Sequence, residues 1–426
     1  MWKLFARQLG ICLFLVLSGT IVRAESGLPG DSQMIGLKEA VARTLARNPE
    51  LIVFGYQLQA QDARVVQAGL APNPELSLTI ENALGTGEFT GMDGAETTLS
   101  IAWVLEHSVR QRRLETARAG VSLLDAEADI LRLDAAAETA RLFFLCLFNQ
   151  TQMVNAGEAV QLAQETVSAV KKRVQAGKSP QAELARARAE LARLKLDLED
   201  FEHELLSASR RLAAQWGETE PDFKRVNGEL VSLPNTDSFE TLKTRIVRNP
   251  DIARFLSKQR VDEAELRLAE AQRKQNWRVS AGVRRLEIAD DEALVANLTI
   301  PLTLRNRNQG GIAEARAKMA QTEADAVAAR IRIETSLFVI YQELQHSLHR
   351  AKTFRDHIIP QLEQALADTR NAYELGRYSY IEWRTVQKDL LEAHRALVEA
   401  SVDAHNNTIE IERLTGVRIA QPTISP

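Results

Sequence analysis

The chain has 426 residues, of which 45% are hydrophobic and 26% charged, and this composition excludes an intrinsically disordered protein. Aromatic residues make up only 5%, and the middle of the sequence is rich in Ala, Leu, Arg and Glu, a mixture that favours long helices. A net charge of -4, without a basic stripe interleaved with aromatic residues, excludes a nucleic-acid-binding surface.

Residues 1–24 have the pattern of a secretory signal peptide. Lys3 and Arg7 precede the apolar stretch LGICLFLVLSG, and VRA, ending at Ala24, suits cleavage before Glu25. The apolar stretch is shorter than the roughly 20 residues of a membrane-spanning helix, and no later segment has about 18 consecutive apolar residues. We therefore expect an exported chain without a spanning helix. Cleavage leaves only Cys146, so we expect no disulfide within the chain, and we expect this cysteine to be buried.

The mature sequence consists of two copies of one unit, residues 25–235 and 236–417, followed by a tail at 418–426. The segment ARNPEL around Pro49 recurs as VRNPDI around Pro250, 201 residues later. The glycine in VQAGKS, Gly177, recurs in YELGRYS as Gly376, 199 residues later. Landmarks that keep nearly the same offset along a chain indicate an internal duplication.

Each copy begins with two helices that are separated at an Asn-Pro pair, because proline disfavours a helical conformation of the residue before it. The expected helices are residues 37–47 and 50–70 in the first copy, and 239–248 and 251–273 in the second. A pair of strands follows in each copy, at about 74–105 and 277–304, with alternating apolar and polar residues. This alternation fits either a half-buried sheet or strands of a membrane barrel.

A long helical hairpin ends each copy, at about 109–216 and about 311–415, and each hairpin turns at a glycine. Residues 109–176 contain no proline, and their only glycines are Gly120 and Gly157. Residues 312–375 contain no glycine, and their only proline is Pro360. A helix of about 65 residues would be roughly 100 Å long, so it needs an antiparallel partner to bury its apolar stripe. Four strands cannot close a barrel, and open edges are not tolerated in lipid, so strands that span a membrane must be pooled by several chains. Three chains would supply twelve strands.

The order of these elements resembles the TolC-type outer membrane factors, a family of outer membrane efflux proteins, over residues 37–417. The resemblance is carried by LKEAVARTLARNPEL and by the two joins between a strand and a long helix. The segment IPLTLRNRNQGGIAEARA resembles the CzcC-type branch, the channels of heavy-metal efflux systems. The family implies an α+β fold with an antiparallel coiled-coil helical barrel and four transmembrane strands per chain, closed by a homotrimer into a twelve-stranded barrel. The first corner, LEHSVRQRRLETARA, departs from the family because it lacks glycine.

The resemblance also implies a function. It predicts a passive conduit in the outer membrane of a Gram-negative bacterium, not an enzyme, with a periplasmic tunnel and no cofactor. The implied partners are two more copies of the chain, a periplasmic adaptor protein, an inner membrane pump of the resistance–nodulation–division type and outer membrane lipid. The implied cargo is a heavy-metal cation of the cobalt, zinc, cadmium and nickel class or of the copper and silver class. Alternatives are a channel for drug efflux or type I protein secretion, and a periplasmic coiled-coil adaptor or scaffold. The sequence holds no HExxH, GxSxG or phosphate-loop motif.

The family places functional residues at three positions. Adaptor contact is expected at the two hairpin turns, which comprise Ala176, Gly177, Lys178, Ser179, Leu375, Gly376, Arg377, Tyr378 and Ser379. Candidate gate residues are Arg377, Tyr378, Glu382 and Asp389, for which a solvated coiled-coil face is the alternative. The corner between strand and helix comprises Arg305, Asn306, Arg307, Asn308, Gln309, Gly310 and Gly311. His346 and His349 are three residues apart but have no third ligand nearby in the sequence, so no metal site is predicted.

Overall fold

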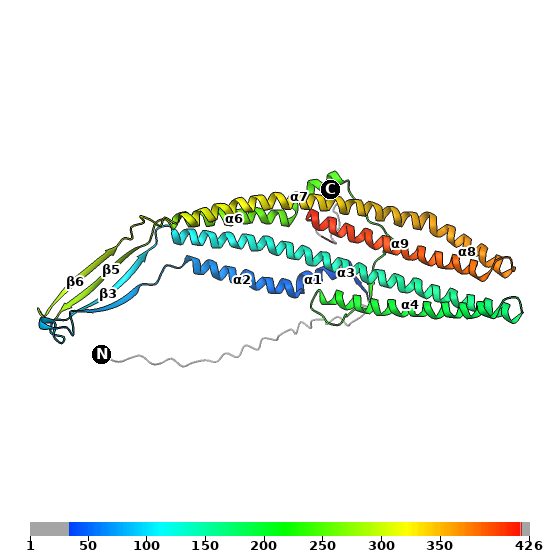
Figure 1. Cartoon of the computed structure of the whole chain (residues 1–426), viewed down its shortest axis with the longest axis horizontal. Coiled ribbons are helices and arrows are strands. Elements are labelled where there is room, and N and C mark those ends of the chain that lie inside the picture. Colours follow the sequence, from blue (N-terminus) through cyan, green and yellow to red (C-terminus); the bar gives the residue numbers. More distant parts are fainter. Residues whose placement is uncertain (1–33, 418, 420–426) are drawn as a thin grey trace, which may run out of the picture.

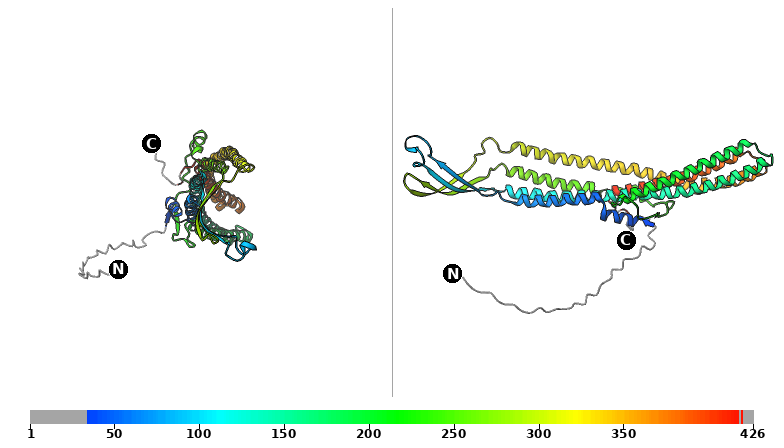
Figure 2. Two further views of the ribbon diagram at one scale, coloured as in Figure 1. Left: turned by 90° about the vertical axis from the view of Figure 1, so that its left-hand side faces the viewer. Right: turned by 90° about the horizontal axis from the view of Figure 1, so that it is seen from below.

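The computed structural model describes residues 34–417 and 419, and the predicted signal peptide lies outside these residues. The chain is elongated, with a sheet at one end and the turns of two helical hairpins at the other (Figure 1). The long helices run side by side between these ends in all views (Figure 2). Among the described helices, none combines the length and the hydropathy that crossing a bilayer requires.

The sheet has four antiparallel strands in the order β2 (Glu75–Glu81), β3 (Glu96–Leu105), β5 (Trp277–Leu286) and β6 (Asp291–Thr299). β3 of the first copy pairs with β5 of the second, from Glu96 opposite Leu286 to Leu105 opposite Trp277. β2 and β6 are therefore the edges. A short 3₁₀ helix, η1 (Gly87–Phe89), lies in the loop between β2 and β3. β6 ends at Thr299, before the expected end at 304, because Pro301 has no amide hydrogen to donate to a neighbouring strand.

The two faces of the sheet differ in polarity, because residues directly opposite one another share a face. One row across the sheet is Leu78, Leu99, Val283 and Leu294, and the last of these is 90% exposed. The other face is polar. There Arg284 donates to Thr98 Oγ1 (2.9 Å) and pairs with Glu96 (2.7 Å). In a single chain the apolar face has no cover, and exposed apolar patches of this kind mark contact with lipid or with protein.

The two hairpins differ in one long helix. In the first copy α3 (Val109–Gln175) is continuous over 67 residues and returns as α4 (Gln181–Ala214). In the second copy the equivalent helix consists of α7 (Gln309–Thr353), a π-helical segment η3 (Phe354–Ile358) and α8 (Ile359–Glu374), and it returns as α9 (Tyr380–Thr415). Pro360 explains the π turn, because its ring would collide with the carbonyl four residues earlier in a regular helix.

Shorter elements pack against the hairpins, and the second helix of each copy lies on the half nearest the sheet (Figure 1). The shorter elements are β1 (Met34–Gly36), α1 (Leu37–Arg47), α2 (Pro49–Gly69), β4 (Arg225–Asn227), α5 (Phe239–Arg245), η2 (Ile246–Arg248) and α6 (Pro250–Ala271). β1 and β4 form a parallel pair that the sequence did not predict, because three-residue strands show no alternation. The main core lies beneath them and joins Phe143, Cys146, Leu212, Trp216 and Phe223. Cys146 is fully buried, as expected, and burial raises the pKa of its thiol to about 12.

The duplication is visible in the side-chain contacts of two asparagines. Asn48 caps α2 by accepting from the Glu50 amide (2.9 Å), and its Nδ2 donates to the Gln215 carbonyl (2.9 Å) at the end of the first hairpin. Asn249 caps α6 by accepting from the Asp251 amide (2.6 Å), and its Nδ2 donates to the Leu414 carbonyl (2.9 Å) at the end of the second. Each copy therefore ties the start of its second helix to the end of its hairpin.

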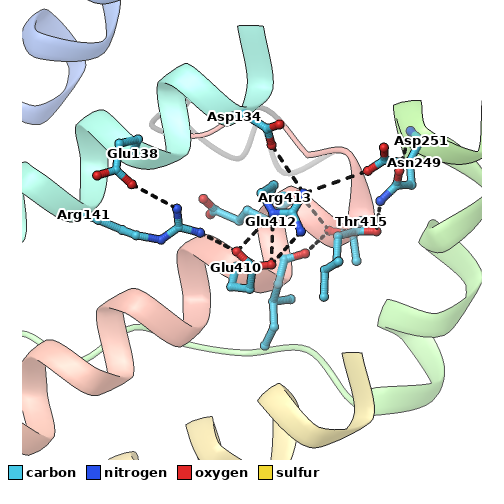
Figure 3. A network of polar contacts seen from close by, with 11 residues as sticks. Asp134, Glu138, Arg141, Asn249, Asp251, Glu410, Glu412, Arg413 and Thr415 are labelled. Atoms are coloured by element: carbon cyan, nitrogen blue, oxygen red, sulfur yellow. Dashed lines mark hydrogen bonds and ion pairs between the residues drawn. The ribbon is translucent and has the colours of Figure 1, made fainter. Parts of the chain in front are cut away.

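A network of charges joins the two copies beside Asn249 (Figure 3). Arg413, near the end of α9, pairs with Glu410 (2.8 Å), with Asp134 on α3 (3.3 Å) and with Asp251 on α6 (3.9 Å). Glu410 also pairs with Arg141 of α3. Hydrogen bonding to Glu410 raises the pKa of Arg413. The network connects α3, α6 and α9 at the level where the short helices meet the hairpins.

Candidate functional site at the hairpin tips

Both hairpins turn through the same backbone geometry. Gly177 and Gly376 have φ angles of 70° and 75°, in the left-handed region that favours glycine. The amide of Gly177 donates to the Val174 carbonyl (3.0 Å), and the amide of Gly376 donates to the Tyr373 carbonyl (2.9 Å). These bonds satisfy carbonyls that the end of each helix leaves open. The predicted turn residues thus form two equivalent tips, defined as residues 176–179 and 375–379.

A single side chain of the first copy connects the two tips. Arg173 donates from one terminal nitrogen to the carbonyls of Tyr373 (2.8 Å) and Glu374 (3.1 Å), and its Nε donates to Ser179 Oγ (3.3 Å). Its guanidinium carbon lies 4.7 Å from the centroid of the Tyr373 ring. The cation therefore caps the C-terminal end of α8, where carbonyl groups concentrate negative charge.

An aromatic cluster lies directly beneath the tips. Tyr373, Tyr380 and Trp383 are each at most 2% exposed, and they pack with Val170 and Leu184 of the first hairpin. The rings of Tyr373 and Trp383 are 5.0 Å apart, and burial raises the pKa of both tyrosines. Trp383 Nε1 is buried without a hydrogen-bond acceptor. Sequence reasoning missed this cluster, although the four aromatic residues within the eleven positions 373–383 were a usable signal.

The candidate gate residues occupy different environments. Arg377 and Tyr378 are exposed in the second tip. Glu382 completes a capping box at the start of α9, where its carboxylate accepts from the amide (2.6 Å) and the hydroxyl (2.9 Å) of Ser379. The backbone bond from Ser379 lowers the pKa of Glu382. Asp389 is exposed on α9, about two turns further from the tip. The structure brings the first three together and places Asp389 apart from them.

Polar contacts join the two hairpins below the aromatic cluster. Arg384 of α9 pairs with Glu190 of α4 (2.8 Å), and Gln387 Nε2 donates to Thr166 Oγ1 of α3 (2.9 Å). Hydrogen bonding, first from Arg193 and then from Arg384, lowers the pKa of Glu190. A cavity of about 140 Å³ lies between α3, α4 and α9 at this level. These contacts fix the spacing between the two hairpins.

The outer surface of the tips is partly apolar. Leu375 is 69% exposed, Tyr378 48% and Ile381 57%. Lys178 and Arg377 are also exposed, so the surface combines apolar and cationic groups. Exposed apolar side chains grouped with polar ones are typical of a surface that contacts another protein.

The predicted corner between β6 and α7 forms a tight turn. Asn308 has a left-handed backbone (φ 55°), and its Nδ2 donates to the Ala269 carbonyl (2.8 Å) at the end of α6. A Cβ on Gly311 would lie 2.6 Å from Asn308 Oδ1, which explains the glycine at this position. In the first copy, which lacks glycine here, Arg113 Nε donates to the Ala68 carbonyl (3.0 Å) instead. Ala68 and Ala269 are 201 residues apart, so the two copies close the same contact with different side chains.

The other predicted corner residues are exposed and bond locally. The amide of Asn308 donates to Asn306 Oδ1 (3.0 Å), the Arg307 amide donates to Gln309 Oε1 (2.9 Å), and Gln309 Nε2 donates to the Arg305 carbonyl (3.4 Å). A Cβ on Gly310 would meet nothing within 4 Å.

Potential metal ligands are dispersed. Over residues 34–417 and 419, no three His, Cys, Asp or Glu side chains are grouped so that they could hold a metal ion. His346 and His349 are exposed on α7.

Comparison with known proteins shows which proteins this chain resembles. The family model described as outer membrane efflux protein matches residues 40–218, most of the first copy. The cobalt-zinc-cadmium resistance protein CzcC of Cupriavidus metallidurans is 26% identical over 380 residues, which cover 89% of this chain and 90% of that protein. This chain therefore resembles the outer membrane efflux proteins, through the family model in its first copy and through CzcC along nearly its whole length. The nickel-cobalt-cadmium resistance protein NccC of Alcaligenes xylosoxydans xylosoxydans is also similar, at 25% identity over 74% of this chain and 70% of that protein.

Solved structures of outer membrane channels have the same fold. CusC superposes with a TM-score of 0.74 at 17% identity, covering 89% of this chain and 92% of CusC. VceC of Vibrio cholerae gives 0.72 at 18% identity, covering 89% and 96%. The predicted fold of a single chain is therefore confirmed, whereas its closure into a homotrimer stays a prediction. The predicted outer membrane location agrees with the description of the matching family model. The family is one of transport conduits, and the absence of enzymatic activity stays a prediction.

Proposed function

We propose that three copies of this efflux protein form the outer membrane channel of a tripartite system that exports heavy-metal cations. The channel is passive, and it receives cations from a periplasmic adaptor and an inner membrane pump of the resistance–nodulation–division type. The observation that carries this proposal is the similarity to CzcC, a cobalt-zinc-cadmium resistance protein, along nearly the whole of both chains. NccC, a nickel-cobalt-cadmium resistance protein, is similar along most of its length.

The open sheet supports a trimer. β2 and β6 are unpaired edges in the single chain, and one face of the sheet is exposed and apolar. Pairing β2 of each copy with β6 of the next satisfies both edges, which lipid requires of a spanning sheet. Three copies then contribute twelve strands, with the apolar faces toward lipid and the polar faces toward the pore.

The tips are the proposed docking surface for the adaptor. Leu375, Tyr378 and Ile381 provide exposed apolar area at the end of the molecule opposite the sheet. Arg377, Tyr378, Glu382 and Asp389 are proposed to lie where the helices of three copies converge. Contacts such as Arg384 with Glu190 then set how far the second hairpin moves from the first.

A conduit for cations needs no tight metal site. Strong binding would slow the exit of each ion, whereas weak contacts along the pore wall permit passage. The dispersed arrangement of ligands in the described residues is compatible with such weak contacts.

The test is growth of a strain that lacks this efflux protein. Plates with graded zinc, cobalt, cadmium, nickel, copper(I) and silver are compared with plates that contain dyes and antibiotics. Selective sensitivity to one or a few metals, restored by the intact gene, is the expected result and names the ions. Sensitivity to organic compounds with normal metal tolerance would instead assign a drug-efflux role. Release of the protein from membranes by a carbonate wash would favour a periplasmic scaffold.

A further inference from the structure

Five exposed cationic side chains lie at the end of the sheet where the strands join the helices. All four strands begin or end at this level, because Leu105 is opposite Trp277 and Arg278 is opposite Thr299. The five residues lie in the segments that follow β3, precede β5 and follow β6. We call them the basic base, and they are Arg110, Arg273, Lys274, Arg305 and Arg307.

The basic base differs from its neighbours because it has no acidic partners. Three other arginines at the same level are paired: Arg112 with Glu115, Arg113 with Glu106, and Arg278 with Glu75. The five members of the basic base form no ion pair within 4.0 Å among the described residues. Five positive charges without an ion pair, gathered at one level, produce a local field that attracts anions.

Large apolar side chains are exposed beside these cations. Leu302 is 78% exposed and Leu304 is 77% exposed, and they lie three residues and one residue before Arg305. Trp277, three residues after Lys274, is 38% exposed, and Trp103 is 42% exposed on the same face of the sheet. Tryptophan at the end of an apolar band is typical of the headgroup level of a bilayer. The apolar face of the sheet is therefore continuous with the basic base.

The opposite end of the sheet carries the opposite charge. Four carboxylates are exposed there: Asp93 in the loop after β2, Glu287 directly after β5, and Asp291 and Glu292 at the start of β6. Arg284 and Arg285 are near that end too, but both are paired with carboxylates, so the cations without an ion pair lie at the end that faces the helices. This polarity would place the basic base at the inner leaflet, whose phospholipids include anionic headgroups.

We propose that the basic base binds the phosphate groups of anionic phospholipids in the inner leaflet of the outer membrane. Guanidinium groups donate two parallel hydrogen bonds to a phosphate, and Leu302, Leu304 and Trp277 lie among the upper acyl chains. The proposal rests on the proposed placement of the four strands across that membrane. One Lys or Arg near an anionic leaflet strengthens the association of the protein with anionic lipid about fivefold. The site therefore fixes the depth of the barrel and selects lipid by charge.

The two exposed tryptophans report on the lipid that surrounds them. The full-length mature trimer is reconstituted in vesicles that contain brominated phosphatidylcholine or brominated phosphatidylglycerol, because bromine quenches nearby tryptophan fluorescence. Trp216 and Trp383 are buried in the helical region, so Trp103 and Trp277 give the quenched signal. We expect phosphatidylglycerol to associate about fivefold more strongly than phosphatidylcholine, and the preference to weaken in 0.5 M salt.

Two variants with the same net charge separate a local site from general charge. The test variant changes all five members of the basic base to glutamine. The ratio of its association with phosphatidylglycerol to that with phosphatidylcholine should fall to about one. The control variant changes five exposed cations on α4 and the following segment to glutamine: Arg186, Arg188, Lys195, Arg211 and Lys224. Its preference should equal that of the wild type.

Three outcomes would overturn the proposal. Equal quenching by both lipids in the wild type would show that the basic base does not select anionic headgroups. A test variant that loses the trimer but keeps its lipid preference would assign the five cations to contacts between copies. Absence of quenching by either lipid would overturn the membrane placement of the strands, and this outcome is distinct from loss of selectivity.

Discussion

Arg173 of the first copy lies against Tyr373 of the second, with its guanidinium carbon 4.7 Å from the ring centroid and a 2.8 Å bond to the Tyr373 carbonyl. The offset of 199 residues between the tips makes Ala372 the counterpart of Arg173. The second copy therefore has no equivalent arginine to reach back to the first tip. This contact joins the hairpins in one direction only, and it lies between the tip surface and the aromatic cluster.

Replacing Arg173 with alanine should loosen the second tip. The change removes the two charged hydrogen bonds to the second copy, the bond to Ser179 and a cation–π contact, and the expected loss of local stability is about 2 kcal/mol. Hydrogen exchange of the backbone amides around Gly376 measures this loss. Lys172→Ala is the matched control, because Lys172 is exposed and belongs to the same helical turn. Equal exchange in wild type and Arg173→Ala would show that the aromatic cluster alone holds the tip.

Changing the exposed apolar residues of the second tip should weaken adaptor docking. The double variant Leu375→Asp with Tyr378→Ala removes apolar contact area and adds a charge, so we expect at least about tenfold weaker binding. Two measurements show the effect: cross-linking to the adaptor in cells, and growth on whichever metal the plate test identifies. Leu84→Asp is the control, since Leu84 is 81% exposed at the opposite end of the chain. Unchanged cross-linking of the double variant would place docking elsewhere.

The sequence predicted the elements that carry a strong period or a marked boundary. The Asn-Pro pairs located the junctions at Asn48 and Asn249, because each asparagine caps the helix that its proline begins. Pro360 was visible in the sequence, but a π turn instead of a break depends on how α8 packs against α9. The reach of Arg173 to Tyr373 depends on the angle between two hairpins, which no local pattern encodes. The burial of Trp383 could not be predicted from the sequence either, because it depends on how the two hairpins pack together.

The two glycines within α3 should respond in opposite ways to alanine. A Cβ on Gly157 would meet nothing within 4 Å, so Gly157→Ala should stabilise the helix by about 0.5 to 1 kcal/mol. A Cβ on Gly120 would lie 2.6 Å from Gln61 Nε2, which donates to the Ala117 carbonyl (2.8 Å). Gly120→Ala should therefore displace Gln61 and destabilise the contact of α2 with α3 by about 1 to 3 kcal/mol. Thermal unfolding of both variants is the measurement, and two changes of the same sign would contradict this account.

Glu412 should make the stability of the helical region depend on pH. Burial at the end of α9 raises the pKa of its carboxyl from 4.5 to about 7. The folded chain therefore binds this proton more tightly than the unfolded chain does. The contribution of this tightly bound proton to the free energy of unfolding is complete below pH 4.5. It is lost as the pH rises to about 7, because the folded state must then hold a buried charge.

The variant Glu412→Gln isolates this effect, because it keeps the shape of the side chain and cannot ionise. At pH 8 it should be more stable than the wild type by roughly 2 to 3 kcal/mol, and at pH 5 the two should be nearly equal. Thermal unfolding of the solubilised channel at both pH values gives the comparison, with Glu363→Gln as the control, since Glu363 is exposed on α8. Because the other ionisable groups are the same in each pair, their titration cancels in the difference. A difference that does not change between pH 5 and pH 8 would mean that the Glu412 carboxyl titrates in water and not in the protein interior.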